Sequence, residues 1–251
     1  NIWLNIVIML LIILGGIGFL TWEDFYTNKF KFKRYRMQSK VILITTAILI
    51  IAPAVFFFAC DFGNLPAGKR LLASVFQSVT TRTAGFNTED LSLMTEAGKA
   101  VMILLMLIGG SPSSTAGGMK TTTFAVLILN ALATFRSRED AGAFGRRFDG
   151  QVVKNAATIA MMYFMLFFFG GITISVYEGL PLLTCLYEAA SAVGTVGLTL
   201  GITPELHIIS RLILIALMYL GRVGGMTLIY AVFSRKNNNG AKMPLEKITV
   251  G

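Results

Sequence analysis

The sequence predicts an all-α integral membrane protein in which long and short helices recur in repeated units. Of the 251 residues, 55% are hydrophobic and only 14% are charged, whereas a typical soluble domain is about 25% charged. Segments 41–60, 155–176 and 208–233 are each close to or above the ~20 apolar residues that cross ~30 Å of hydrocarbon. Segments 70–82 and 180–193 are too short to cross, and their length is typical of re-entrant helices.

The charged residues are clustered along the chain. The formal net charge is +9, and 15 of the 22 Lys and Arg fall in three segments separated by apolar stretches long enough for a helical hairpin. The positive-inside rule places such segments in the cytoplasm. The charge therefore marks loops at one membrane face, and no nucleic-acid partner is expected. The three basic segments comprise Lys29, Lys31, Lys33, Arg34, Arg36 and Lys40; Arg136, Arg138, Arg146, Arg147 and Lys154; and Arg235, Lys236, Lys242 and Lys247.

Residue types that serve enzymes and metal sites are scarce. Cys60 and Cys185 are too few and too far apart for a disulfide framework or a metal site. The single histidine, His207, stands beside Glu205 at the start of an apolar run, where a residue at the membrane edge is a better interpretation than a ligand. We therefore predict no catalytic residues and no enzyme activity. We also predict no cofactor in this chain and no metal beyond a transported cation.

The chain matches itself at a fixed spacing. Residues 83–86 (TAGF) and 195–198 (TVGL) lie 112 residues apart, and each follows one of the short segments. Residues 105–109 (LMLIG) and 217–221 (LMYLG) align at the same spacing. Two matches on one offset indicate a duplication.

The register of the repeat then slips, because 117–119 (GGM) aligns with 224–226 (GGM) at an offset of 107. A partial third copy opens the chain, where 1–14 resembles a short apolar helix and 16–19 (GIGF) takes the place of the TAGF motif. Each complete unit therefore reads as span, short helix, glycine loop and span. The chain begins at Asn1, inside apolar sequence and without a signal peptide, so we expect an N-terminally truncated protein.

The glycine loops can offer backbone carbonyls to a cation. A cation in a membrane exchanges its water shell for oxygen ligands, and carbonyls supply these without the cost of burying a fixed charge. The potassium-channel motif TVGYG begins with the same three residues as 195–197, and the short helices would aim their negative ends at the pore. The alternative is that the glycines only let helices pack closely. The predicted ion filter comprises Gly18, Thr83, Ala84, Gly85, Thr195, Val196 and Gly197.

Residues 97–133 contain enough apolar sequence for a span but are interrupted by the polar run 109–118, which cannot remain an ordinary helix. Such backbone at membrane depth is tolerated only when buried in protein or lining a watery cavity, so we predict a movable plug below the filter. A phosphate-binding loop is rejected, because Met119 separates Gly118 from Lys120 where that motif requires Gly-Lys.

Three charged residues fall at unusual places for a membrane protein. Arg222 lies ~22 Å into its helix, where it would pair with the polar run or raise an electrostatic barrier; snorkelling towards the cytoplasm is the alternative. Glu188, in the second short helix, is predicted to anchor its loop by hydrogen bonds, with ion ligation as the alternative. Arg82 is predicted to brace its own loop in the same way.

Taken with these motifs, the chain resembles the membrane subunits of bacterial Ktr potassium-uptake systems, in the wider Trk/Ktr/HKT potassium transporter superfamily. The resemblance rests on 77–88 (QSVTTRTAGFNT), 109–123 (GGSPSSTAGGMKTTT), 191–198 (SAVGTVGL) and 221–224 (GRVG), and it covers essentially the whole chain. It implies four units of helix, pore helix and helix around one pore, as in potassium channels, with a filter glycine from each. The filter glycines implied for units two to four are Gly18, Gly85 and Gly197.

The same resemblance divides the chain and assigns a gate. Residues 1–40 would be the end of unit two (pore helix, filter loop, short second helix and basic cytoplasmic loop), 41–150 unit three with its broken second helix, and 151–251 unit four with the C-terminal tail. The polar run would be an intramembrane gating loop. The first unit, whose filter residue separates potassium from sodium preference in plant members, would be absent. The implied gate comprises Gly109, Gly110, Ser111, Ser113, Ser114, Thr115, Gly117, Gly118, Lys120 and Arg222.

The predicted function is potassium uptake by channel-like permeation through the carbonyl filter, with sodium dependence left open. The resemblance implies a multi-pass protein of the plasma membrane, surrounded by lipid, that forms a homodimer. It also implies a cytoplasmic RCK-type (KtrA-like) regulatory subunit, which alone would carry a nucleotide. Three alternatives stay open: a sodium-selective member of the same family, a secondary transporter with broken helices, and a structural subunit whose glycines only pack helices.

Overall fold

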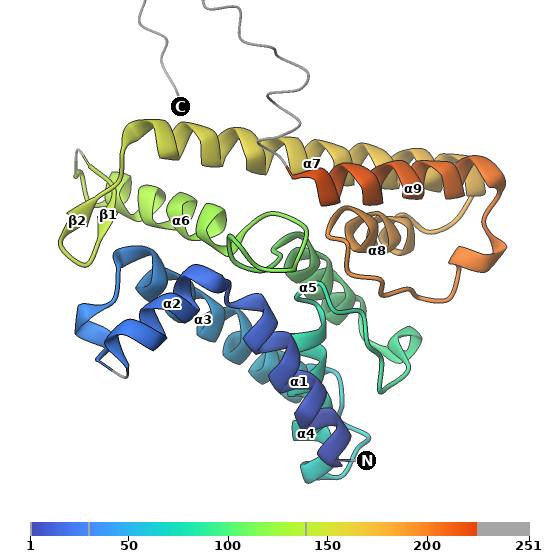
Figure 1. The fold of residues 1–251 in the computed structure, drawn as a ribbon. Helices are drawn as coiled ribbons and strands as arrows, with labels where there is room; N and C mark the ends of the chain where they lie inside the picture. Colours follow the sequence, from blue (N-terminus) through green and yellow to red (C-terminus); the bar gives the residue numbers. More distant parts are fainter. Residues whose placement is uncertain (1, 30, 139, 225–251) are drawn as a thin grey trace, which may run out of the picture.

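The computed structural model describes residues 2–29, 31–138 and 140–224 (Figure 1). This part of the chain is predominantly helical, as predicted, with one short hairpin. The helices are α1 (Ile2–Gly16), α2 (Phe19–Asn28), α3 (Met37–Cys60), α4 (Ala67–Thr80), α5 (Glu96–Leu107), α6 (Thr121–Phe135), α7 (Gly150–Glu178), α8 (Leu182–Val193) and α9 (Ile208–Val223). Single 3-10 turns occupy Phe32–Arg34, Leu91–Leu93 and Thr203–Glu205, and the hairpin strands are β1 (Gly142–Ala143) and β2 (Arg146–Arg147).

Within the described residues, α3 and α7 are the two helices long and apolar enough to cross a membrane. They confirm the predicted spans 41–60 and 155–176. The third predicted span, 208–233, begins as α9 and is helical to Val223, and the rest of it lies outside the described residues. Many large apolar side chains on α3 and α7 are exposed, among them Ile48 and Phe169. Such surfaces suit a hydrocarbon environment, since water would penalise them.

The two short helices α4 and α8 confirm the expectation for 70–82 and 180–193. Each follows a proline, Pro66 or Pro181, at the N-terminal boundary, where the missing N–H costs nothing. The last residues of α4 are buried against α3 and α1, and most of α8 is buried because it packs among α5, α7 and α9 (Figure 1). A short apolar helix enclosed by longer ones fits the geometry of a pore helix.

The N-terminal segment is bent sharply. Helices α1 and α2 form one apolar stretch with a bend of 92° between them. The bend falls at Gly18, whose φ of 89° lies in the left-handed region that glycine adopts without a steric cost. The predicted short apolar helix over 1–14 and the glycine loop after it are therefore confirmed.

The second helix of unit three is broken, as predicted. Helix α5 ends at Leu107 and α6 begins at Thr121, and the intervening backbone forms a closed loop. The base of this loop is fastened by a parallel bridge between Ile108 and Met119, in which the N–H of Gly109 donates to the carbonyl of Met119 at 2.7 Å. We call residues 108–120 the intramembrane loop. The bridge satisfies backbone groups that would otherwise be costly at membrane depth.

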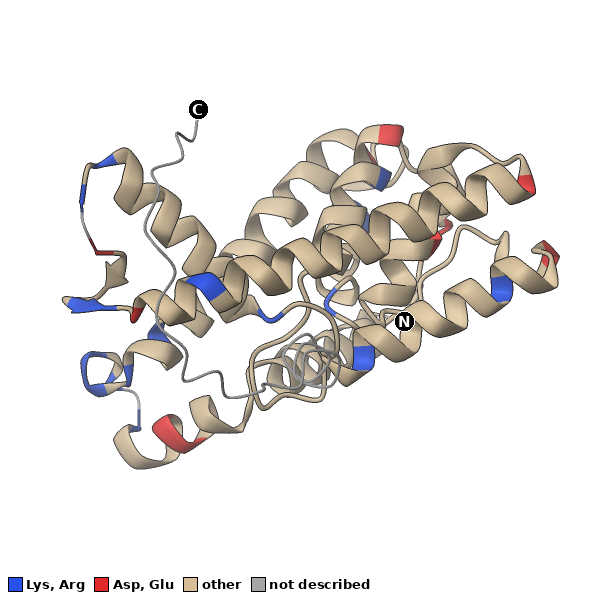
Figure 2. Cartoon of the chain, turned by 90° about the horizontal axis from the view of Figure 1, so that it is seen from above, with Lys and Arg blue, Asp and Glu red and all other residues tan. Residues whose placement is uncertain are grey.

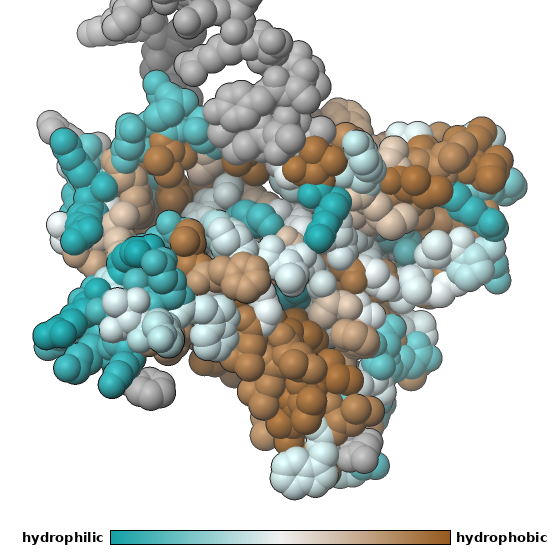
Figure 3. Space-filling model, in the orientation of Figure 1, coloured by the Kyte–Doolittle hydropathy of each residue, from teal (hydrophilic) through white to brown (hydrophobic). Residues whose placement is uncertain are grey.

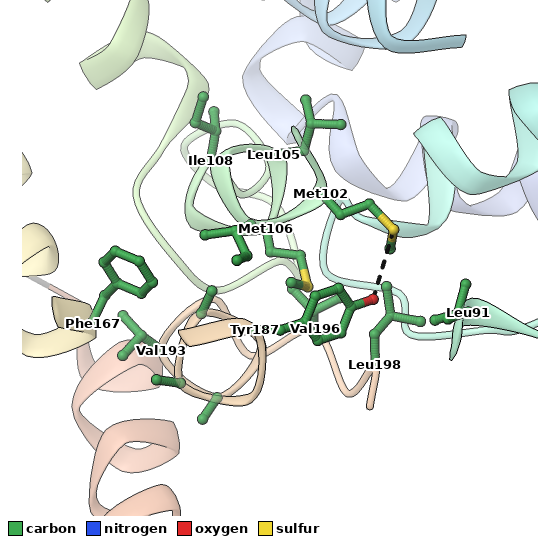
Figure 4. Close-up of a cluster of buried hydrophobic side chains, with 14 of the residues drawn as sticks. Leu91, Met102, Leu105, Met106, Ile108, Phe167, Tyr187, Val193, Val196 and Leu198 are labelled. Atoms are coloured by element: carbon green, nitrogen blue, oxygen red, sulfur yellow. Dashed lines mark hydrogen bonds between the residues drawn. The ribbon is translucent and has the colours of Figure 1, made fainter. Parts of the chain in front are cut away.

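The core lies where α5 meets α8 (Figure 4). Met102, Met106 and Tyr187 are fully buried there, and the Tyr187 hydroxyl points at the Met102 sulfur across 3.7 Å. Val196, in the loop after α8, packs into the same cluster. The loop that follows α8 is therefore packed into the hydrophobic core.

Charge and hydropathy separate along the molecule. Figure 2 shows basic residues of 29–40 and 136–147 gathered at one end. In Figure 3 that end is hydrophilic, whereas α1 and the far parts of α7 and α9 present hydrophobic surface. This distribution is typical of a membrane protein with one basic face.

An acidic side chain ties the first helix to the second in each of units three and four. Asp61, directly after α3, accepts hydrogen bonds from the backbone N–H and the hydroxyl of Thr95, at 2.9 and 2.8 Å. Glu178, the last residue of α7, accepts from the backbone N–H of His207 at 2.9 Å and lies 2.8 Å from its Nδ1. Thr95 and His207 are 112 residues apart, the offset of the sequence repeat. The repeat therefore extends to contacts made by unlike residues.

Candidate functional site

The loop after α4 carries the first set of predicted filter residues. Thr83 and Gly85 have positive φ angles of 59° and 75°, whereas Ala84 between them does not. The N–H groups of Ala84 and Gly85 both donate to the carbonyl of Thr80 near the end of α4, at 3.2 and 3.3 Å. A positive φ at a β-branched residue is strained, and strain of this kind clusters at functional sites.

The loop after α8 repeats this backbone. Thr195 and Gly197 have φ angles of 53° and 91°, and Val196 between them does not have a positive φ. The N–H of Val196 donates to the carbonyl of Ser191 at 2.8 Å, and the N–H of Gly197 donates to the Ser191 hydroxyl at 3.2 Å. The two loops therefore share a Thr-x-Gly conformation whose N–H groups face the end of the preceding short helix.

The carbonyl groups of these loops differ from the N–H groups in their hydrogen bonding. Among the described residues, no hydrogen bond reaches any of the six carbonyl oxygens of the two Thr-x-Gly motifs. Backbone carbonyls without a protein partner require water or a ligand. Since five of the six N–H groups of the two motifs are occupied and the carbonyls are not, the loops are suited to binding a cation and unsuited to binding an anion. The six residues are Thr83, Ala84, Gly85, Thr195, Val196 and Gly197.

The loops converge in space. A side-chain carbon placed on Gly85 would collide with the carbonyl oxygen of Val196, so the second and third predicted filter loops are in direct contact. A side-chain carbon on Gly18 would collide with the carbonyl of Pro112, so the first loop lies against the intramembrane loop. Gly197 has no described neighbour within 4 Å of its would-be side chain.

The intramembrane loop contacts the filter loops of all three predicted units. The N–H of Ser111 donates to the carbonyl of Gly16 at 2.9 Å, beside the unit-two loop. A side-chain carbon on Gly109 would lie 3.4 Å from the Thr83 methyl group, and one on Gly117 would collide with Thr195. The polar run that interrupts the second helix is therefore placed against the predicted filter.

Two cationic side chains hold the carbonyls of the intramembrane loop. An Arg222 guanidinium nitrogen donates to the carbonyl of Thr115 at 2.7 Å, which confirms the predicted pairing of Arg222 with the polar run. Lys120 donates to the carbonyl of Ala116 at 2.6 Å. Hydrogen bonds from charged donors are roughly twice as strong as neutral ones. The loop thus carries two neighbouring positive charges, held by its own backbone oxygens.

The remaining predicted gate residues are distributed along this loop. The Ser111 hydroxyl lies 3.0 Å from that of Thr121. Ser113 has a positive φ of 60° and accepts a hydrogen bond from the N–H of Phe19 at 3.1 Å. The hydroxyl of Ser114 is buried without a partner among the described residues. Gly110 is packed too closely to carry a larger side chain without movement of its neighbours, and Gly118 has a positive φ of 66° that favours glycine.

Glu188 anchors the loop of unit four. Its buried carboxylate accepts hydrogen bonds from the hydroxyl of Thr199 at 2.7 Å, the N–H of Leu200 at 2.9 Å and the hydroxyl of Thr203 at 2.9 Å. These three donors belong to the chain that follows the filter residues. The predicted anchoring role is therefore confirmed.

The role predicted for Arg82 is wrong in its target. Its guanidinium is buried and donates to the carbonyl of Gly109 at 3.3 Å, not to its own loop. Arg82 stands just after the end of α4, and its side chain reaches the start of the intramembrane loop. The residue thus links the filter end of unit three to the intramembrane loop.

Two supports of the filter loops escaped the sequence analysis. Besides its carbonyl contacts, Thr80 donates its hydroxyl to the carbonyl of Phe86 at 2.7 Å, and Ser191 uses both its carbonyl and its hydroxyl. A hydroxyl residue three or four positions before each filter threonine was the available signal. His207 caps α9 and binds Glu178, and no cluster of metal-ligating side chains occurs within the described ranges.

A cavity of about 540 Å³ borders the second filter loop. Its wall includes Thr195 and Gly197, and it extends from Glu188 to Arg222. The residues predicted as filter, loop anchor and gate contact therefore share one space. Most of the remaining lining is apolar.

The chain has relatives among cation transport proteins. The TrkH family model, described as cation transport protein, matches residues 1–240. The potassium/sodium uptake protein NtpJ of Enterococcus hirae is 38% identical over 100% of this chain and 58% of its own length. The Ktr system potassium uptake protein B of Bacillus subtilis is 34% identical over 98% of this chain and 56% of its own length. The chain thus spans little more than half the length of these relatives.

A solved structure shows the same fold. The potassium transporter TrkH from Vibrio parahaemolyticus superimposes with a TM-score of 0.76 at 17% identity, over 92% of this chain and 52% of that one. The all-α integral membrane fold is therefore confirmed, and the relatives are transport proteins rather than enzymes, as predicted. Because the family model covers nearly the whole sequence, this chain belongs to the TrkH family of cation transport proteins.

Proposed function

We propose that this chain forms part of a potassium-uptake path through the plasma membrane, in which K⁺ passes a filter of backbone carbonyls. The observation that carries the proposal is the repeated Thr-x-Gly backbone with bound N–H groups and unpartnered carbonyls. A dehydrated cation needs several oxygen ligands at once, and loops from successive units supply them when they converge. The contact between Gly85 and Val196 supports that convergence.

The intramembrane loop is the proposed gate. Its contacts with all three loops, and its fastening by Arg222 and Lys120, would keep it under the filter in a closed state. Release of these hydrogen bonds would let it swing aside. Deleting Ser111 to Ala116 in the protein expressed at its full length should raise basal K⁺ flux, and unchanged flux would remove the gating role.

The proposed location and partners of the protein are those implied by its resemblance to the Trk/Ktr/HKT superfamily. The basic end of the molecule would face the cytoplasm by the positive-inside rule. The protein would work as a homodimer with a cytoplasmic nucleotide-binding regulatory subunit of the RCK type. The proposed ion filter depends on neither the homodimer nor the regulatory subunit. Co-purification of a dimer with that subunit would test both.

The decisive experiment is potassium-uptake complementation in cells that lack their own potassium transporters. The protein at its full length should restore growth at low K⁺. The Gly197→Ser variant should lose uptake or admit Na⁺, because a side chain at a φ of 91° distorts the filter backbone. Gly68→Ser is the matched control, since Gly68 lies in the first turn of α4 with no described neighbour within 4 Å. Full rescue by the Gly197→Ser variant would place the ion path elsewhere.

A sodium-conducting role is the second candidate. It is favoured by the relative from Enterococcus hirae, whose name includes sodium. Flux measured in proteoliposomes with K⁺ or Na⁺ alone separates the two ions. Uptake of Na⁺ in preference to K⁺ would favour the sodium-selective alternative. Saturable uptake of an organic solute that ignores both ions would instead support a secondary transporter.

A further inference from the structure

An apolar groove lies between α3 and α6. It has a volume of about 410 Å³ and an almost wholly apolar lining. Ile44 and Ile48 of α3 face Ile128 and Leu132 of α6 across it, and Phe144 of the hairpin closes one end. Ile48 and Ile128 are 58% and 45% exposed, so the groove opens to the outside of the described chain.

The groove occupies one leaflet of the membrane. Helix α3 begins at Met37, within the basic segment 29–40, and α6 ends at Phe135, directly before the second basic segment. Ile48 lies 11 residues into α3 from Met37, which is ~16 Å of helix and about half of the ~30 Å hydrocarbon thickness. An acyl chain of the leaflet on the basic side would therefore run along the groove.

A cation stands at the closed end of the groove. The Lys40 ammonium lies 5.6 Å from the centre of the Phe144 ring and 5.9 Å from that of Phe32. It donates one hydrogen bond, to the carbonyl of Lys33 at 2.8 Å, out of the three that an ammonium can make. Arg146 and Arg147 follow Phe144 in the hairpin; within the described part of the chain Arg147 pairs with Asp140 at 3.2 Å, and Arg146 has no acidic partner.

We propose that this groove is a binding site for an anionic phospholipid, with an acyl chain between α3 and α6 and the phosphate beside Lys40. The occupant is set by complementarity: an apolar channel of leaflet depth ends at a positive charge at headgroup level. Basic residues near the cytoplasmic face attract anionic lipids. A zwitterionic lipid would satisfy the apolar part of the site but gain less at Lys40.

The site is placed to act on the proposed gate. Helix α6 starts at Thr121, whose N–H donates to the carbonyl of Gly110 at 3.0 Å and whose hydroxyl lies 3.0 Å from that of Ser111. A lipid packed along α6 holds the helix on which the intramembrane loop ends. This regulatory consequence rests on the proposed function, whereas the binding itself does not.

The test measures lipid binding first. The purified protein at its full length is incubated with phosphatidylglycerol or phosphatidylcholine, and bound lipid is counted by native mass spectrometry. Wild type should retain phosphatidylglycerol in preference, and Lys40→Gln should reduce that preference about fivefold, the change expected for one lysine at an anionic surface. Ile128→Trp should reduce retention of both lipids by filling the groove. Lys69→Gln, on α4, is the control and should change neither.

Two results would overturn the site: equal phosphatidylglycerol retention by wild type and the Lys40→Gln variant, or disulfide cross-linking of two copies through Ile128→Cys, which would mean that a second copy covers the groove. Potassium flux in phosphatidylcholine liposomes is measured alongside. Flux without lipid preference defeats the lipid site alone, and lipid preference without flux defeats the proposed function alone.

Discussion

The filter loops of units three and four have the same backbone and different supports. Both place a left-handed threonine two residues before a left-handed glycine. In unit four the chain beyond the glycine is tied to the Glu188 carboxylate by three hydrogen bonds. In unit three the residue at the same offset is Phe76, and the hydroxyl of Thr80 makes one bond to Phe86. A shared loop backbone is thus compatible with different hydrogen-bonded supports around it.

The second helices differ in the same sense. Helix α9 continues to Val223, whereas the equivalent α5 stops at Leu107 and gives way to the intramembrane loop. Arg222, near the end of α9, then reaches the loop that follows α5. The two second helices therefore contribute differently: α5 leads into the intramembrane loop, and α9 supplies a charged donor to that loop.

The largest effect on K⁺ uptake is expected from substituting the glycines of the two predicted filter loops. Gly85→Ala combines a strained φ with a collision against the Val196 carbonyl, whereas Gly197→Ala meets only the strain among described residues. We expect Gly85→Ala to abolish K⁺ uptake and Gly197→Ala to lower it by roughly tenfold, the cost of ~1–2 kcal/mol for a left-handed alanine. Uptake assays on cells with matched expression measure both.

Gly68→Ala is the control for these variants, since this glycine lies in the first turn of α4 with a free would-be side chain. Its uptake should equal wild type. Equal losses in the Gly85→Ala and Gly197→Ala variants would show that contact between the two loops adds nothing to the filter.

The anchor in unit four sharpens the comparison. Glu188→Leu removes the acceptor of three hydrogen bonds and leaves the Leu200 N–H unpaired, each bond to a charged group being worth ~1.5–3 kcal/mol. We expect a more than tenfold loss of uptake together with a raised Na⁺ to K⁺ permeability ratio. Glu188→Gln keeps an acceptor oxygen and should lose less. Phe76→Leu, at the equivalent place in unit three, should leave the ratio unchanged.

Permeability ratios come from flux in proteoliposomes under opposed K⁺ and Na⁺ gradients. A lower uptake with an unchanged ratio in the Glu188→Leu variant would reduce Glu188 to a general stabiliser. A changed ratio in the Phe76→Leu variant would mean that unit three is as sensitive as unit four.

The link between the units gives a smaller effect. Arg222→Gln removes a charged donor to the Thr115 carbonyl, and basal flux should rise roughly tenfold if that bond, worth ~1.5 kcal/mol or more, favours the closed loop. Arg222→Lys should fall between. Arg211→Gln is the matched control, since Arg211 lies on the same helix and donates to other carbonyls, those of Leu206 and Pro204 at 2.7 Å each. Flux unchanged by Arg222→Gln would separate this bond from gating.

Much of the fold was predictable because the membrane restricts the choices. Apolar length gave α3 and α7, and consecutive glycines in an apolar stretch gave the break after α5, since neither feature depends on distant partners. The pairing of Arg222 with the polar run was predictable for a related reason: an intramembrane guanidinium needs an acceptor, and the run was the nearby source of free carbonyls.

Features set by tertiary contact could not be found this way. Arg82 donates to the Gly109 carbonyl because of the place where α5 ends. No local sequence pattern encodes that place. Nothing in the sequence singles out Asp61 and Glu178, because their partners lie 34 and 29 residues away and differ in type. The groove between α3 and α6 likewise depends on how two helices pack.

Removing the carboxylates that tie the first helix to the second should have the smallest effect on uptake. The effects in units three and four should be similar. Asp61→Ala and Glu178→Ala each remove an acceptor of two hydrogen bonds. We expect each to cost ~1–2 kcal/mol and lower the melting temperature by a few degrees, with K⁺ uptake at low temperature changed less than twofold. Thermal unfolding of the purified protein measures this. If only one of the pair destabilised the protein, the ties would not be equivalent, and the symmetry of units three and four would stop at the filter backbone.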